Sequence, residues 1–273
     1  DVHNVVRFEI NMMLRGVIQR LSATPRMRTV GCLLHTSTGV RTSSTPQPDT
    51  DSSTTDGGYI DIDGLQFQTD NVTNITPAIL SKIGLNLHHI ENHPLRIIKD
   101  KIASYMVRSY TGIGKPEFKL IDNGNPAVTI EANFDSVLVP EDHVSRTPND
   151  NYYVNSTHVL RAHTSAHQVE YMKQGNTAFL IAGDVYRRDE IDRSHYPVFH
   201  QMEGVRLFDL REINSNTNQS VFENKTRTRR SQDLHTLATS RLIAEDLKGV
   251  LTGLVVELFG DVECRWVDTY FPF

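Results

Sequence analysis

The stretch of residues 178–208 constrains the fold of this chain most, because two apolar runs flank a charged segment there. Residues 178–182, followed by Val185 and Tyr186, and residues 205–208 are rich in side chains that favour strands. Two such runs around a polar connection are typical of an antiparallel strand pair joined by a long hairpin loop. We therefore expect the fold to be built around this strand pair.

The connection between the two runs carries more charge than a simple turn requires. It includes Arg187, Arg188 and Asp189, and His195 follows a few residues later. Arginine presents a planar fork of donors that matches phosphate oxygens and keeps its charge at physiological pH. A polyphosphate site is one interpretation of this pattern. On charge alone, a solvated loop with surface ion pairs worth about 0–1 kcal/mol each is the favoured interpretation.

Composition and cysteine usage limit the class of protein further. The 273 residues are 38% hydrophobic and 22% charged, and the formal net charge is −5. These values are typical of a soluble globular protein and predict no general nucleic-acid footprint, so any RNA contact must be local. Cys32 and Cys264 are far apart and indicate neither a disulfide framework nor a metal cluster. No apolar run approaches the roughly 20 residues of a membrane helix, so no membrane association is expected.

The first 58 residues differ in composition from the rest of the chain. Between Glu9 and Asp49 there is no acidic residue, while arginine and serine recur, which is typical of an organelle transit peptide. Residues 42–58 contain no large apolar side chain and cannot bury enough surface to offset their ordering entropy. We therefore expect a disordered transit peptide and linker over residues 1–58 and a folded domain over residues 59–273. A flexible basic tail is the alternative for the first part.

Helical signals accompany the strand pair. Thr76 before Pro77 and the run Asn92-His93-Pro94 are start signals that precede apolar stripes at helical spacing. Residues 233–259 have apolar side chains spaced by threes and fours and are followed by Gly260, a helix-ending residue. Together with the strand pair, these segments predict an α+β domain.

Two histidines invite comparison with a metal site. His163 and His167 are four residues apart and could share one helical face as ligands. No cysteine or acidic residue stands nearby at a suitable spacing to supply a third ligand, which disfavours zinc. A polar helix start capped by Thr164 or Ser165 explains the same residues about as well.

The order of residues in the central stretch resembles the second signature motif of the class II aminoacyl-tRNA synthetases. Gly-Asp-Val-Tyr-Arg-Arg-Asp at 183–189 and Phe-His-Gln-Met-Glu-Gly at 199–204 are similar to phenylalanyl-tRNA synthetases, above all to the single-chain mitochondrial type. The resemblance runs from about Ile75 to Phe273 and includes His-Thr-Ser at 163–165. It implies the class II catalytic core, a mostly antiparallel sheet flanked by helices, incomplete at the C-terminus.

Matched residue by residue, the resemblance also implies two substrate sites. Arg187 would be the catalytic residue, bridging the amino-acid carboxylate and the α-phosphate of ATP. The implied ATP contacts are Arg187, Asp189, Ser194, His195, Tyr196 and Phe199. The implied amino-acid contacts are His163, Ser165, Ala166, His167, Gln168, Gln201, Met202, Glu203, Phe271 and Phe273. No side chain is assigned as a metal ligand, and Mg²⁺ is implied by the polyphosphate of ATP.

The chain departs from the family's pattern where it stops. The family continues past the position of Phe273 with a third motif and, in the mitochondrial type, an anticodon-binding domain. We therefore expect this chain to be a fragment that is poorly stable and largely inactive on its own. Its parent is expected to be a monomeric phenylalanine–tRNA ligase of the mitochondrial matrix, or of another organelle such as a plastid, with tRNA(Phe) as its partner.

A second hypothesis comes from a different functional class, a non-catalytic binding module derived from such an enzyme. Intact Arg187, Gln201, Glu203 and Phe271 argue against it, because a non-catalytic descendant has no physical need for all four.

Overall fold

The computed structural model describes residues 4–12, 29–31, 58–111, 117–188, 191, 195–208, 212–213, 221–223 and 235–266, the first two ranges as backbone only. Its strands are β1 (Asn4–Met12), β2 (Thr29–Gly31), β3 (Tyr59–Ile62), β4 (Leu65–Gln68), β5 (Lys119–Ile121), β6 (Ala127–Thr129), β7 (His158–Leu160), β8 (Ala178–Tyr186), β9 (Val198–Phe208) and β10 (Glu263–Arg265). Its α-helices are α2 (Pro77–Leu80), α3 (Pro94–Ser109), α4 (Ile130–Asn133), α5 (Gln168–Lys173) and α7 (Leu237–Phe259). The 3-10 helices are η1 (Leu87–His89), η2 (Asp135–Val137), η3 (Val144–Arg146) and η4 (Thr164–His167).

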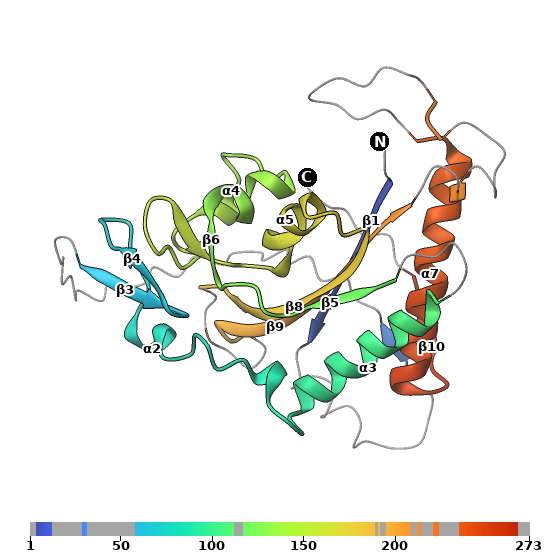
Figure 1. Ribbon diagram of the computed structural model, residues 1–273, viewed down its shortest axis with the longest axis horizontal. Helices are drawn as coiled ribbons and strands as arrows, with labels where there is room; N and C mark the ends of the chain where they lie inside the picture. Colours follow the sequence, from blue (N-terminus) through green and yellow to red (C-terminus); the bar gives the residue numbers. More distant parts are fainter. Residues whose placement is uncertain are drawn as a thin grey trace.

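A four-stranded sheet in the order β1-β9-β8-β5 lies at the centre of the molecule (Figure 1). β8 and β9 form the predicted antiparallel pair, in a register that aligns Ala178 with Arg206 and Tyr186 with Val198. β1 is antiparallel to β9, whereas β5 is parallel to β8. The prediction of an α+β core around a mostly antiparallel sheet is confirmed.

β1 differs from what the sequence predicts. The composition predicts disorder over residues 1–58, whereas Asn4–Met12 pairs with β9 and Thr29–Gly31 pairs with β10. The physical reason lies in the sheet, because β9 would otherwise present an unpaired edge that attracts a further strand. The sequence does carry a signal for this pairing, since apolar and polar residues alternate from Val6 to Met12. Residues 13–28 and 32–57 lie outside the described residues.

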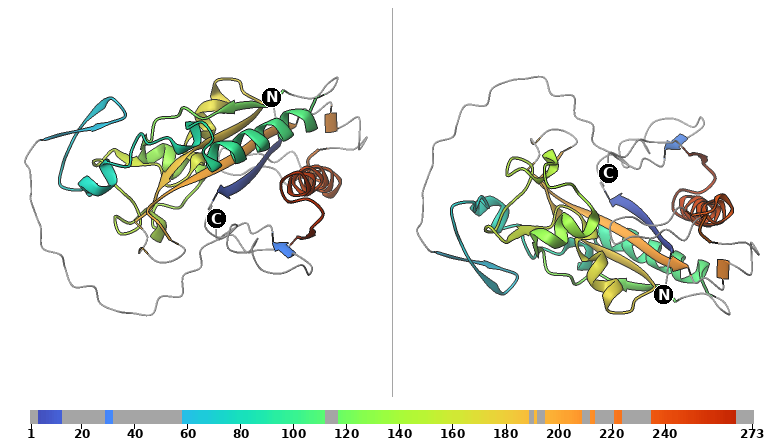
Figure 2. Two further views of the ribbon diagram at one scale, coloured as in Figure 1. Left: turned by 90° about the horizontal axis from the view of Figure 1, so that it is seen from below. Right: turned by 90° about the horizontal axis from the view of Figure 1, so that it is seen from above.

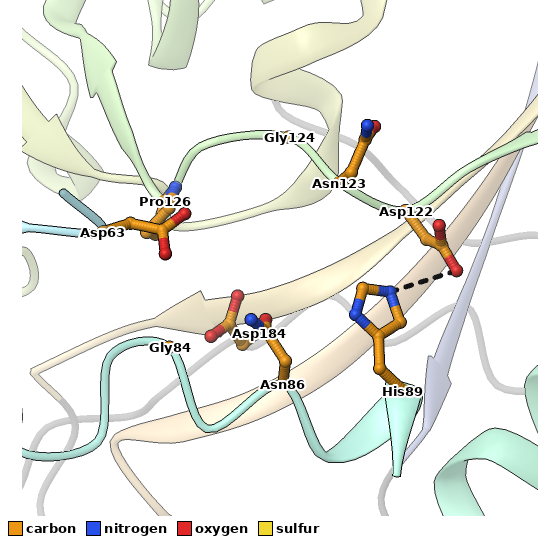
Figure 3. A pocket seen from close by; sticks show the side chains of 9 residues that line it. All are labelled: Asp63, Gly84, Asn86, His89, Asp122, Asn123, Gly124, Pro126 and Asp184. Atoms are coloured by element: carbon orange, nitrogen blue, oxygen red, sulfur yellow. Dashed lines mark ion pairs between the residues drawn. The ribbon is translucent and has the colours of Figure 1, made fainter. Parts of the chain in front are cut away.

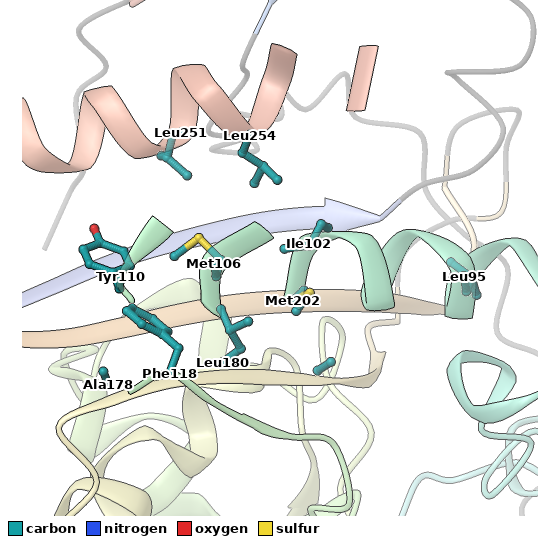
Figure 4. Packing of buried hydrophobic residues seen from close by; sticks show 11 residues of the cluster. Leu95, Ile102, Met106, Tyr110, Phe118, Ala178, Leu180, Met202, Leu251 and Leu254 are labelled. Carbon is teal, nitrogen blue, oxygen red and sulfur yellow. The ribbon is translucent and has the colours of Figure 1, made fainter. Parts of the chain in front are cut away.

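One face of the sheet, the back face, packs against α3 and α7. Alternate residues of a strand point to the same face, and Leu180, Ala182 and Met202 enter this layer together. The cluster is built of the buried side chains Leu95, Ile102, Met106, Tyr110, Phe118, Ala178, Leu180, Ala182, Met202, Leu251 and Leu254 (Figure 4). This apolar layer joins the central strands to the two helices.

The two long helices begin where local chemistry allows. The ring of His93 accepts a hydrogen bond from the amide of Leu95, and Pro94 occupies the first helical turn. α7 begins at Leu237 behind a Thr236 cap, four residues later than the sequence predicts. A Cβ on Gly253 would lie 2.1 Å from the hydroxyl of Tyr105, so this glycine lets the two helices approach.

The opposite face of the sheet, the front face, is covered by η4, α5 and the segments around α4 (Figure 1). Tyr171 of α5 packs there on Phe179, Ile181 and Val205. The β3–β4 hairpin and α7 lie at opposite ends of the molecule, and α7 is seen end-on in Figure 2. None of the helices in the described part of the chain combines the length and apolarity that a membrane span requires.

Candidate active site

Two polar side chains of β9 point from the front face into the interior. Gln201 and Glu203 are both fully buried, and they share a face because they stand two residues apart on one strand. A buried carboxylate is stable only when donors or charges compensate for its lost hydration. The sequence prediction that these two side chains point the same way is confirmed.

The donors for Glu203 come from η4 and from the first residue of α5. The hydroxyl of Ser165 donates to Oε2 at 2.5 Å, and that of Thr164 lies 3.4 Å from the same oxygen. The amide of Gln168 donates to Oε1 at 3.2 Å. The backbone amide of Thr164 donates to Oε1 of Gln201 at 3.2 Å, so η4 orients both side chains. η4 therefore fixes an amide–carboxylate pair on the sheet.

Arg187 follows β8 directly and lies at the rim of the same face. Its Nε donates to the carbonyl of Ala162 at 2.9 Å, and its guanidinium lies 5.2 Å from the ring centroid of Phe199. Phe199 stands two residues before Gln201 on β9, so its ring projects from the front face. The guanidinium and the amide–carboxylate pair thus occupy one side of the strand pair.

The loop after Arg187 is described in part. His195 and Tyr196 are exposed, and Nζ of Lys82 lies 5.3 Å from the ring centroid of Tyr196. Four other residues that the sequence predicts as substrate contacts lie outside the described residues: Asp189, Ser194, Phe271 and Phe273.

Three residues that the sequence predicts to contact the amino acid lie away from Gln201 and Glu203, because their side chains point in other directions. Met202 stands between Gln201 and Glu203 on β9, so its side chain points to the opposite, back face. There it is fully buried against α3 and α7. Ala166 packs into a cluster with Val128 and Phe134. The His167 ring turns toward Arg161, 3.1 Å from its Nη1. His163, by contrast, adjoins η4 in extended backbone, directly before the residues that hold Glu203.

Sequence reasoning missed three buried residues at this site. Thr164 belongs to the His-Thr-Ser stretch of the resemblance but is not among the predicted contacts, although it contacts both Gln201 and Glu203. Arg161 and Asp184 form an ion pair at 2.5 Å with both side chains almost wholly buried. The signal for this ion pair is that Arg161 stands in the apolar run before the His-Thr-Ser stretch. A charged residue in a buried run needs a partner of opposite charge.

A polar cavity of about 120 Å³ lies beside the strand pair and is distinct from the amide–carboxylate site. It is lined by Asp63, Gly84, Asn86, His89, Asp122, Asn123, Gly124, Pro126 and Asp184 (Figure 3). Asp122 forms ion pairs there with Lys99 and with His89, the latter at 3.2 Å. Among the described residues, no group of three or more His, Cys, Asp or Glu side chains is placed to hold a metal ion.

The fold and the site define a class of protein. A mostly antiparallel sheet backed by helices carries an arginine at one strand end beside a hairpin loop, and a buried amide–carboxylate pair on the next strand. These are features of a class II aminoacyl-tRNA synthetase core. Residues 81–233 match the family model described as "tRNA synthetases class II core domain (F)", and the chain belongs to this family.

Curated relatives extend this result over most of the chain. The mitochondrial phenylalanine–tRNA ligase of Rattus norvegicus is 48% identical over 223 residues, which cover 80% of this chain and 47% of the relative. A probable mitochondrial phenylalanine–tRNA ligase of Drosophila melanogaster is 44% identical over 78% of this chain and 51% of its own length. The chloroplastic/mitochondrial enzyme of Arabidopsis thaliana is 46% identical over 76% and 43%, respectively. The chain thus spans about half the length of the curated relatives it matches.

Proposed function

We propose that the protein containing this chain is a mitochondrial phenylalanine–tRNA ligase, which activates phenylalanine with ATP and transfers it to tRNA(Phe). The observation that carries this proposal is the placement of Arg187 on the same side of the strand pair as Gln201 and Glu203. The curated relatives, which bear this activity in their names, support it. The arginine-rich, acid-poor composition of the N-terminal segment supports the location.

In the first step, an oxygen of the phenylalanine carboxylate attacks the α-phosphorus of ATP. The bond from that phosphorus to the bridging oxygen breaks, and pyrophosphate leaves with the electron pair. Arg187 would contact both the attacking carboxylate and the α-phosphate, since a guanidinium fork matches two oxygen acceptors at once. The chain supplies position and charge rather than covalent chemistry.

The amide–carboxylate pair would hold the other end of the amino acid. An ammonium group has three donors and no acceptor, so it needs oxygen partners such as Oε1 of Gln201 and the carboxylate of Glu203. Hydrogen bonds from Thr164, Ser165 and Gln168 fix those oxygens before the substrate arrives. Preorganisation of this kind reduces the cost of ordering the site on binding.

The remaining contacts extend the proposal to the ring and the nucleotide. Phe271 and Phe273 would meet the substrate ring edge-to-face, a geometry worth about 0.5–1.5 kcal/mol beyond burial. An apolar pocket rejects an added hydroxyl by only about 100-fold, so tyrosine is the competitor to test. Phe199 would stack on adenine, and His195 and Tyr196 would approach the nucleotide from the loop.

The second step transfers the activated amino acid to tRNA. A terminal ribose hydroxyl attacks the carbonyl carbon of the adenylate, and AMP leaves with the bridging oxygen. Mg²⁺ would neutralise polyphosphate charge, and the phosphate oxygens of ATP together with water would supply most of its ligands.

Pyrophosphate exchange into ATP by the full-length protein tests the activity. We expect exchange that depends on phenylalanine and that is much weaker with tyrosine, histidine or serine at the same concentration. Exchange driven by another of these amino acids would overturn the substrate assignment. Binding of tRNA without exchange for any of them would support the alternative of a non-catalytic module.

A further inference from the structure

Arg161 is a buried arginine that the proposed chemistry does not use. It follows β7 directly, and its side chain is only 3% exposed. Burying a guanidinium costs free energy unless the surroundings replace its hydration, so its partners indicate what it does.

The guanidinium of Arg161 joins three separate parts of the fold. Its Nη1 donates to the carbonyl of Gly124 at 2.7 Å and to Nε2 of His167 at 3.1 Å. Its Nε donates to the carbonyl of Asp184 at 2.6 Å, and its Nη2 to the carboxylate of the same residue at 2.5 Å. One side chain therefore ties the loop before β6, the end of η4 and the strand β8 together.

The space around this side chain depends on glycine. A Cβ on Gly183 would lie 2.4 Å from Nη2 of Arg161, a distance at which the guanidinium must move. A Cβ on Gly124 would lie 2.9 Å from Nε2 of His167, the ring that accepts from Arg161. Because both positions are glycines, no Cβ collides with the guanidinium of Arg161 at Gly183 or with the ring of His167 at Gly124.

The charges along the connection are set by the same contacts. Burial and the charge of Arg161 lower the pKa of His167 to about 4, so its ring is neutral and its Nε2 accepts. The pKa of Asp184 is held below its ordinary value: burial opposes this, but Arg161 and the donating hydroxyl of Tyr186 outweigh it. The result is one cation and one anion held between neutral groups.

We propose that Arg161 is a positioning residue for the amino-acid site, an inference that rests on the proposed function. The segment that begins at Arg161 and ends at Gln168 supplies the described hydrogen bonds to Arg187, Gln201 and Glu203 that orient the site. Arg187 bonds to the carbonyl of Ala162, and Thr164, Ser165 and Gln168 hold Gln201 and Glu203. Arg161 anchors this segment at its start and, through His167, near its end. Its role is to hold η4 at the distance from β9 that the ammonium group requires.

The first test replaces the planar guanidinium of Arg161 by the ammonium group of lysine. Arg161→Lys keeps the positive charge but cannot reach Gly124, His167 and Asp184 together. We expect the KM for phenylalanine in exchange to rise roughly 10- to 100-fold, while the KM for ATP changes little. Arg108→Lys is the matched control, because Arg108 forms an exposed ion pair with Glu257 on the helix layer. A purely structural role would instead reduce the amount of active enzyme and leave both KM values unchanged.

The second test displaces Arg161 without replacing it. Gly183→Ala should raise the KM for phenylalanine in the same selective way, because the new methyl group would lie 2.4 Å from Nη2 and force the guanidinium to move. Gly249→Ala is the control, since a Cβ there meets nothing within 4 Å. Folded variants at both positions with an unchanged KM for phenylalanine would overturn the role of Arg161, and so would failure of both variants to fold. Absence of phenylalanine-dependent exchange in the unsubstituted protein would instead overturn the proposed function.

Discussion

At the scale of single residues, the adjacent β9 residues Met202 and Glu203 point to opposite faces of the sheet and have different roles. Glu203 is held by η4 on the front face, whereas Met202 packs between the sheet and the two long helices. The resemblance of the motif assigns both residues to the amino-acid site but does not give the direction of their side chains. That direction follows from the alternation of side chains along the strand. Thr164 is harder to predict, because a hydroxyl next to a possible helix start is explained equally well as a cap.

Substitution at these two adjacent positions separates the faces. Glu203→Gln removes the charge that would hold the ammonium group, and we expect the KM for phenylalanine to rise about 100-fold. Met202→Leu conserves volume on the back face and should cost less than about 1.5 kcal/mol of stability with an unchanged KM. Steady-state exchange kinetics and urea unfolding measure both effects. A selective loss of phenylalanine affinity in Met202→Leu would contradict this division of the strand.

At the scale of elements, the sequence predicts the β8–β9 strand pair but not the strand that pairs with its outer edge, β1. Residues 178–208 carry their own strand and loop signals, so local sequence suffices for β8 and β9. β1 depends on a long-range pairing, and the arginine-rich composition of the N-terminal segment outweighed its weak alternation. α7 shows the same limit at its start, because Thr236 rather than a residue near Asp233 caps the helix.

A buried ion cluster connects α7 to the back of β9 and can be tested by itself. Arg206 bonds to Asp246 of α7 at 2.9 Å, pairs with Glu212, and lies against the rings of Tyr110 and Phe208. We expect Asp246→Asn to lower the free energy of unfolding by about 2 kcal/mol, because a buried guanidinium loses a charged partner.

Glu257→Gln is the control for this substitution, since it breaks an exposed ion pair that joins α7 to Arg108 of α3. It should change stability by less than about 0.5 kcal/mol in urea unfolding. Equal effects of the two substitutions would mean that the Arg206 cluster does not secure α7.

At the scale of the whole molecule, buried histidines make stability depend on pH. Burial lowers the pKa of His167 and of His200 from the ordinary 6.5 to about 4, and it also lowers the pKa of His88. The unfolded chain therefore binds more protons than the folded chain between pH 6.5 and pH 4. Stability contributed by the neutral rings is present above pH 6.5 and is lost as the pH falls through this window.

Urea unfolding at pH 7 and pH 5 measures this dependence. We expect each of His167 and His200 to contribute about 2 kcal/mol less at pH 5 than at pH 7. His200→Gln should reduce the difference between the two pH values, because glutamine does not titrate. A free energy of unfolding that is equal at pH 7 and pH 5 would show that these rings are already accessible to protons in the folded state.

We propose that the guanidinium of Arg187, at the end of β8, contacts the reacting phosphate beside the site for the amino acid. Phenylalanine-dependent pyrophosphate exchange by the full-length protein, compared between Arg187→Ala and Arg188→Ala, tests it most directly. Arg188 is the matched control, because it lies next in the chain and bonds outward to the carbonyl of Pro148. We predict a loss of at least about 100-fold in kcat for Arg187→Ala and near-normal exchange for Arg188→Ala. Near-normal exchange in Arg187→Ala, or equal losses in both variants, would contradict the account.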